Sequence, residues 1–212
     1  MSTRNVILGM GLTDGYGNLH GAWRAPGVNP GNYADIDASI RYAQAAERGL
    51  FTFLFTPDFP GVRGDVERTT ISNVLDPIVS LTAIARATER IGFVATGSTT
   101  FQEPFNLARQ FKALDVISHG RAGWNAVTTS DPTVAANYGR AVAERAERYA
   151  RAHEAIQITQ ALWGAGKRAP GSRTSPGTAS SIRRSCGRST CRANMSHLVG
   201  RSRSLLPSRA SP

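Results

Sequence analysis

The stretch ERIGFVATGSTTFQEPFNLARQFKALDVISHGRAGWN, residues 89–125, decides the fold of this chain. It contains two apolar runs, residues 91–96 and 121–129, that are typical of β-strands ending in small polar side chains. Between them Pro104 opens a helix and Gly120 ends it. The residues expected on the apolar face of this helix are Phe105, Ala108, Phe111 and Leu114. Strand, helix and strand in this order form one repeat of a β/α fold, whose chemistry lies at the carboxyl ends of the strands.

The same alternation of strand and helix runs through residues 1–163. The other predicted strands are residues 6–10 and 50–56. The other predicted helices begin near Ile36, at the pair Asp76-Pro77 and near Tyr149. The connections are too long for hairpins, so parallel strands with right-handed crossovers are expected. The sequence therefore predicts an α/β domain over residues 1–163, the N-terminal half of a TIM (β/α)8 barrel.

The charge of the chain is concentrated behind this domain. Of the 25 Lys and Arg side chains, ten lie in residues 164–212, which contain no Asp or Glu, so the other 15 balance the 15 acidic side chains of residues 1–163. Residues 164–212 are rich in Arg, Ser, Gly and Pro and show no sustained apolar periodicity, which is typical of a disordered basic tail. Acids, aromatics and periodicity all disappear after Trp163, so we favour the more specific hypothesis that this tail is GC-rich DNA translated out of frame.

Composition also limits the class of protein. Cys186 and Cys191 form a lone C-x₄-C pair without the further ligands that a structural zinc site needs, so no metal is expected. Residues 1–163 contain no cysteine, which suits a reducing cytosol. The sequence has neither a signal peptide nor an apolar run of about 18 residues. We therefore expect a cytoplasmic protein that does not enter a membrane.

Two strand ends resemble those of a known enzyme family. Residues 94–100 read VATGSTT and residues 120–128 read GRAGWNAVT. They are similar to the patterns VATxSTT and GRAGWNxVT of the flavin-dependent, luciferase-like monooxygenases of the nitrilotriacetate monooxygenase type. The resemblance covers about residues 6–163, and members of the family continue well beyond that point. It therefore implies a chain that is truncated after Trp163.

The resemblance also implies which residues contact the flavin. Asp58, in TPDF, stands where the family has LADS, and Thr96 and Asn125 lie in the two matching strand ends. Tyr149 corresponds to the tyrosine of the family's pattern H-x-x-R-Y, whose histidine is replaced here by Arg145. From the residues alone, Asp58 is equally well explained as a loop cap and Thr96 as an ordinary strand former. We assign these four residues to FMN binding and leave the catalytic residues unknown, because a flavin carries the difficult chemistry itself.

The function implied by the resemblance is that of a two-component monooxygenase. A separate flavin reductase supplies reduced FMN, which is used with molecular oxygen to oxygenate a small organic substrate. A chain truncated after Trp163 is expected to be impaired or inactive, and it could form a homo-oligomer. The alternative is a protein that binds nucleic acid or another anionic surface through its basic tail. We consider nucleic acid the less favoured partner, because the tail lacks interleaved aromatic residues and the domain before it is neutral.

Overall fold

Four strands and the helices that follow them make up the part of the chain that the structure describes. The computed structural model describes residues 6–13, 16, 21–61 and 75–165. The strands are β1 (Gly9–Gly11), β2 (Phe53–Thr56), β3 (Gly92–Ser98) and β4 (Ala122–Val127). The α-helices are α1 (Ile36–Arg48), α2 (Pro77–Arg86), α3 (Pro104–Ile117), α4 (Pro132–Asn137) and α5 (Arg145–Ala165), and two 3₁₀ helices are η1 (Ala22–Arg24) and η2 (Asn32–Ala34).

The chain divides into two units, Met1–Thr159 and Gln160–Pro212. Of the second unit the structure describes residues 160–165, which are the last residues of α5. The predicted basic tail, with Cys186 and Cys191, falls almost wholly on residues 166–212, which lie outside the described residues. The domain boundary after Trp163 therefore stays a prediction.

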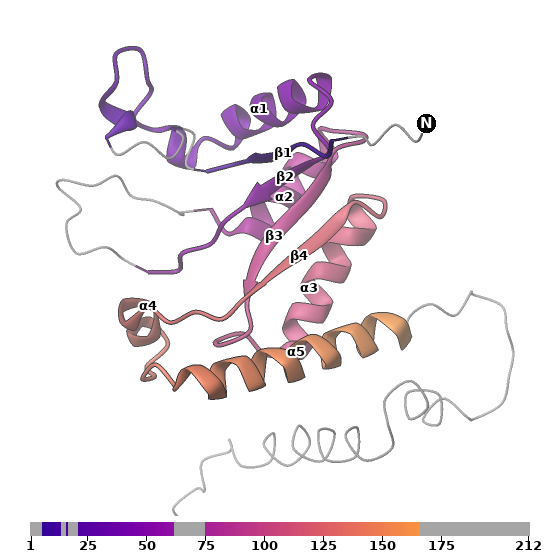
Figure 1. Cartoon of the computed structure of the whole chain (residues 1–212). Helices are drawn as coiled ribbons and strands as arrows, with labels where there is room; N and C mark the ends of the chain where they lie inside the picture. Colours follow the sequence, from indigo (N-terminus) through magenta and orange to yellow (C-terminus); the bar gives the residue numbers. More distant parts are fainter. Residues whose placement is uncertain (1–5, 14–15, 17–20, 62–74, 166–212) are drawn as a thin grey trace, which may run out of the picture. The chain divides into compact units, whose positions relative to one another are not determined.

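The sheet has the order β1-β2-β3-β4, and every neighbouring pair of strands is parallel (Figure 1). The expectation of a parallel sheet built in chain order is confirmed. The register sets Thr56 beside Ala95, and Thr96 beside Asn125. Because all four strands point the same way, their carboxyl ends form one common edge of the sheet.

Three helices cover one face of this sheet. α1 packs on α2, α2 packs on α3 and β3, and α3 packs on β4. The largest fully buried side chains between these layers include Leu54, Leu81, Ile84, Phe93 and Leu114. This is the arrangement of successive units in a (β/α)8 barrel, where the helices lie outside and the opposite face of the sheet lines the interior.

The helix starts predicted at Asp76-Pro77 and at Pro104 are confirmed, and α2 has the expected side-chain cap. The Asp76 side chain accepts hydrogen bonds from the backbone N–H groups of Ile78 and Val79 at 2.9 and 3.0 Å, with Pro77 in the first turn of α2. Such a cap satisfies donors that have no partner inside the helix. α3 begins at Pro104 as predicted. It ends at Ile117, and the chain then turns through Gly120, whose φ of 86° is a conformation that glycine adopts readily.

Three details differ from the sequence prediction. Residues 6–8 lie outside β1, and their side chains Val6, Ile7 and Leu8 are exposed. Phe105 is 60% exposed and Leu107 is buried in its place, because the helix is rotated relative to the predicted apolar face.

The short helix α4 was not predicted, although Asp131-Pro132 repeats the cap and proline that begin α2. The Asp131 side chain accepts from Thr133 N–H at 2.7 Å, which is the signal that could have revealed it.

Glu47 ties α1 to the start of β3. One carboxylate oxygen, Oε1, accepts hydrogen bonds from the backbone N–H groups of Glu89, Arg90 and Ile91 at 3.0, 2.6 and 2.9 Å. Burial raises the pKa of this carboxyl, but the three backbone donors and the Arg90 charge outweigh burial and hold the pKa below its usual value. The contact is a stabilising link at the amino ends of the strands, away from the edge where function is expected.

Arg121 makes a second link at the same end of the sheet. Its guanidinium lies 4.8 Å over the Phe93 ring and hydrogen bonds to several backbone carbonyls at 2.7 to 3.0 Å. The acceptors are the carbonyl oxygens of Ala85, Thr88, Ile91 and Ser118. Arg121 therefore joins the end of α2, the start of β3 and the end of α3.

Within the described part of the chain, no helix combines the length and the apolar character that crossing a bilayer requires.

Candidate functional site

A pair of polar side chains, Thr96 and Asn125, lies near the carboxyl edge of the sheet. Thr96 Oγ1 donates a hydrogen bond to the backbone oxygen of Thr56 at 2.9 Å, and Asn125 Nδ2 donates to Thr96 Oγ1 at 3.0 Å. Thr96 is 5% exposed, and Asn125 is half-buried. The structure thus brings two of the predicted site residues into direct contact.

The face on which this pair lies follows from Gly97. A Cβ on Gly97 would lie 2.9 to 3.0 Å from side-chain atoms of Trp124, Leu107 and Phe111, so Gly97 faces α3 and allows the strand to pack closely on it. Side chains alternate along a strand, so Thr96 points to the opposite face. The Thr96–Asn125 pair therefore faces what is the interior in a β/α barrel.

Hydroxyl groups continue beyond the end of β3. Ser98 Oγ lies 2.8 Å from Thr129 Oγ1, and Thr99 Oγ1 donates to the Val127 carbonyl at 3.0 Å. Thr100 Oγ1 is buried and has no hydrogen-bond partner among the described residues. A buried hydroxyl without a partner is costly, so this group is suited to binding a water or a ligand atom.

Asp58 is half-buried just after β2. Burial raises the pKa of its carboxyl to about 6, the negative charge of Asp76 adds to the rise, and a hydrogen bond from the Phe59 backbone opposes it. Burial together with the charges of Asp58 and Asp76 also raises the pKa of the Tyr138 hydroxyl. Asp58 can therefore exchange a proton near neutral pH, at the end of the sheet where chemistry is expected.

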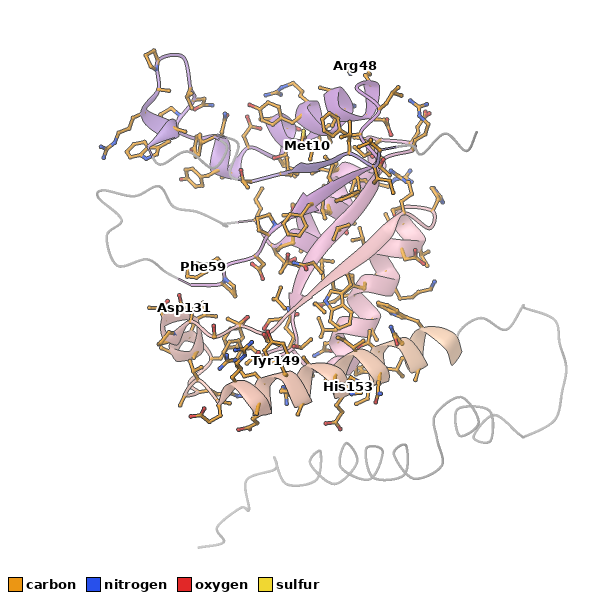
Figure 2. All side chains as sticks on the ribbon, viewed as in Figure 1. Met10, Arg48, Phe59, Asp131, Tyr149 and His153 are labelled. Atoms are coloured by element: carbon orange, nitrogen blue, oxygen red, sulfur yellow. The ribbon has the colours of Figure 1, made fainter. Side chains whose placement is uncertain are left out.

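The helix α4 packs on the loops that follow β2 and β3. Val134 and Ala135 of α4 form a buried cluster with Phe101, which follows β3. This cluster packs against Phe59, and Figure 2 shows Phe59 next to α4. Asn137 Nδ2 donates to the Pro60 carbonyl at 3.0 Å. This contact joins the loop after β2 to the end of α4.

Tyr138 follows α4 directly, and its ring stacks on the Phe101 ring with centroids 4.6 Å apart. Because the charge of Asp58 contributes to the raised pKa of its hydroxyl, Tyr138 belongs to the surroundings of Asp58. Sequence reasoning missed Tyr138, since no motif marks it and its role depends on where α4 packs.

Tyr149 lies in the first half of α5 and is 55% exposed (Figure 2). The Arg145 guanidinium lies 5.6 Å from its ring centroid, a distance at which cation and ring attract each other. Arg151 Nε donates to the Thr99 carbonyl at 2.9 Å, which places α5 against the loop after β3. Among the described residues, no hydrogen bond connects Asp58 or Tyr149 to the Thr96–Asn125 pair.

No group of three or more His, Cys, Asp or Glu side chains is placed to hold a metal ion within residues 6–13, 16, 21–61 and 75–165.

Comparison with known proteins identifies the family. Residues 19–184 match the luciferase-like monooxygenase family, so the match continues past Trp163. The chain is 38% identical over 156 residues to nitrilotriacetate monooxygenase component A from Aminobacter aminovorans. The match covers 68% of this chain and 34% of that protein. The chain belongs to the luciferase-like monooxygenase family. It spans about a third of the length of this curated relative.

Solved structures agree with this assignment. The EDTA monooxygenase from Chelativorans sp. BNC1 is 36% identical and aligns with a TM-score of 0.75 over 82% of this chain and 42% of its own. A riboflavin lyase solved with modified FMN and riboflavin is 27% identical, with a TM-score of 0.68 over 76% of this chain and 38% of its own. The predicted family, the barrel-type α/β fold and the link to flavin-dependent oxidoreductases are confirmed.

Proposed function

We propose that these β/α units form one side of the flavin site of a two-component monooxygenase. In this proposal a separate flavin reductase supplies reduced FMN, and a small organic substrate is oxygenated with molecular oxygen. The observation that carries the proposal is the Thr96–Asn125 pair, which faces the barrel interior in a chain of the luciferase-like family. The name of the relative, component A of nitrilotriacetate monooxygenase, supports an enzyme of more than one component.

The chemistry of the side chains fits a flavin ring. Its edge alternates N–H donors and carbonyl acceptors, and an asparagine amide offers both kinds of group. No hydrogen bond among the described residues uses Asn125 Oδ1, so this oxygen can accept from a ligand. A Cβ on Gly11 would meet nothing within 4 Å, which supports open space beside β1.

Each proposed contact has a role that its surroundings support. FMN, when bound, supplies the chemistry that activates oxygen, and the protein binds it, orients it and excludes water. Asp58, with a carboxyl pKa of about 6, can hold or release a proton beside the ligand. Arg145 and Tyr149 present a guanidinium and a phenol on the exposed side of α5, where the cation suits a phosphate group.

We expect the four described β/α units by themselves to bind FMN weakly. In (β/α)8 barrels the phosphate site is frequently built from the loops after strands 7 and 8, whereas the described residues comprise four β/α units. A charge-assisted hydrogen bond to phosphate is worth about 1.5 to 3 kcal/mol, and about 1.4 kcal/mol is a factor of ten in affinity. A site that lacks two such bonds has a dissociation constant of roughly millimolar where the complete site is micromolar.

The test is an FMN titration of the purified full chain, followed by reductase-coupled oxygenation of candidate substrates such as nitrilotriacetate. We expect saturable binding that Asn125→Ala weakens about tenfold, as for loss of one hydrogen bond to the ligand. A matched control is Gln110→Ala, which removes an exposed amide on α3, the helix that packs on the opposite face of the sheet. Binding that is absent at millimolar FMN, or equal in wild type and Asn125→Ala, would contradict the proposal.

A further inference from the structure

The orientation of the Asn125 amide follows from the number of protons on Thr96. A threonine hydroxyl carries a single proton, and a backbone carbonyl oxygen can only accept a hydrogen bond. Thr96 Oγ1 lies 2.9 Å from the Thr56 carbonyl oxygen, so this bond uses the hydroxyl proton. The Asn125 group at 3.0 Å from Thr96 Oγ1 must then be the donor, which is Nδ2. The amide can therefore lie in one orientation only, with Oδ1 turned away from Thr96.

This chain of hydrogen bonds is anchored to the sheet itself. It runs from the β2 backbone at Thr56, through Thr96 on β3, to Asn125 on β4. Thr96 and Asn125 are direct neighbours in the register of β3 and β4. Thr96 is only 5% exposed, so water competes little for its hydroxyl. The amide is consequently held by the backbone of a strand two positions away in the sheet.

We infer that Thr96 is a positioning residue, whose hydroxyl fixes Asn125 so that Oδ1 is presented as an acceptor to an N–H group of the ligand. The inference rests on the proposed function for the identity of that ligand, a flavin, whose ring carries an N3–H between two carbonyl groups. The second proton of Asn125 Nδ2 remains available as a donor to one of these carbonyls. The site thereby selects a ring edge that offers a donor beside an acceptor.

Substitution of Thr96 separates this role from simple packing. Thr96→Val keeps the branched shape but removes the hydroxyl, which leaves the amide of Asn125 free to turn over. Thr96→Ser keeps the hydroxyl and loses only a methyl group, so it is the conservative control. If Thr96→Val does not fold, Thr96→Ala removes the same hydroxyl without adding bulk and serves in its place.

The first measurement needs no flavin. In the ¹⁵N-labelled full chain, the exchange of the Asn125 side-chain NH₂ protons with water is measured, and Asn125→Ala assigns these signals by removing them. We expect slow exchange in wild type and Thr96→Ser, and exchange about tenfold faster in Thr96→Val, because the hydrogen bond from Asn125 to the buried Thr96 hydroxyl is lost. Equal exchange in wild type and Thr96→Val overturns the inference even if the chain binds no flavin.

The second measurement compares FMN with 3-methyl-FMN, which lacks the N3–H. We expect wild type and Thr96→Ser to bind FMN about tenfold more tightly than the methylated form, as for one hydrogen bond, and Thr96→Val to lose that preference. A preference that Thr96→Val retains, or that Thr96→Ser loses equally, overturns the inference. Failure of wild type to bind either flavin contradicts the proposed function instead, and the exchange measurement then decides the role of Thr96.

Discussion

Replacement of Glu47 tests how the amino end of the sheet is stabilised. Its Oε1 accepts three backbone hydrogen bonds, from Glu89, Arg90 and Ile91. A hydrogen bond to a charged group contributes about 1.5 to 3 kcal/mol, but here one oxygen is shared by three donors. Only the bond to Ile91 is part-buried, so water replaces much of what the other two lose. We therefore expect Glu47→Ala to reduce the free energy of unfolding by about 2 to 4 kcal/mol.

Glu47→Gln separates charge from geometry. The amide oxygen can still accept from the same N–H groups, while the charge that strengthens these bonds is gone. We expect a loss of about 1 to 1.5 kcal/mol, roughly half that of Glu47→Ala. At about 2 to 4 °C per kcal/mol for a domain of this size, the melting temperature falls by about 2 to 6 °C in Glu47→Gln.

The effect of Glu47 depends on pH in a direction that its lowered pKa fixes. A carboxyl whose pKa is lower in the folded chain stabilises above the unfolded pKa, and this contribution disappears as pH falls through the folded pKa. The ordinary value for this group is 4.5. The difference in unfolding free energy between wild type and Glu47→Gln should therefore be full at pH 7 and shrink below about pH 4.5.

The assay is urea unfolding of the full chain and both variants, repeated between neutral and acidic pH. Arg48→Ala is a suitable control, because Arg48 is an exposed neighbour on the same helix. Two results would contradict the stabilising role of Glu47. One is a loss below about 0.5 kcal/mol in Glu47→Ala, which is the scale of an ordinary surface substitution. The other is a difference between wild type and Glu47→Gln that does not change with pH.

Three further predictions follow from the described contacts. Arg121→Lys should lower the free energy of unfolding, measured with urea, by about 2 to 3 kcal/mol, because an ammonium group cannot make the several hydrogen bonds and the ring contact of the guanidinium. An unchanged free energy of unfolding would show that these hydrogen bonds contribute little. The Asp58 carboxyl should titrate near pH 6 by ¹³C NMR, and Asp76→Asn should lower that pKa; a value near 3.8 contradicts the half-buried placement. Because this pKa is raised on folding, the stability of wild type relative to Asp58→Asn should be greatest below about pH 3.8 and fall as pH rises through about 6. Asn137→Ala should speed amide exchange in α4 severalfold by removing its bond to Pro60, and unchanged exchange would argue against that tie.

Local signals in the sequence predicted much of the fold. Asp76-Pro77 and Pro104 mark helix starts because they act on the first turn of their own helix, and both are confirmed. Parallel strands follow from connections that are too long for hairpins. Thr96 and Asn125 were expected at the same end of the sheet, and their direct contact follows once the strands pair in register.

Contacts between distant residues could not be predicted in the same way. Glu47 reaches backbone groups 42 to 44 positions further along the chain, and no feature of α1 alone indicates this partner. Tyr138 lies near Asp58 only because α4 packs on the loop after β2. Phe105 fits the apolar periodicity but is exposed, because the sheet contacts a helix face rotated toward Leu107. Tertiary packing decides each of these positions.

We propose that the inner face of the sheet, at Thr96 and Asn125, forms part of a flavin site. The most direct test is to titrate FMN into the ¹⁵N-labelled full chain and follow the backbone signals of both residues and the side-chain NH₂ signal of Asn125. We expect saturable shifts of these signals at roughly millimolar FMN, with no comparable shift at Glu47 or Arg121 at the opposite end of the strands. Shifts that spare Thr96 and Asn125, or that appear only at the opposite end, would contradict it.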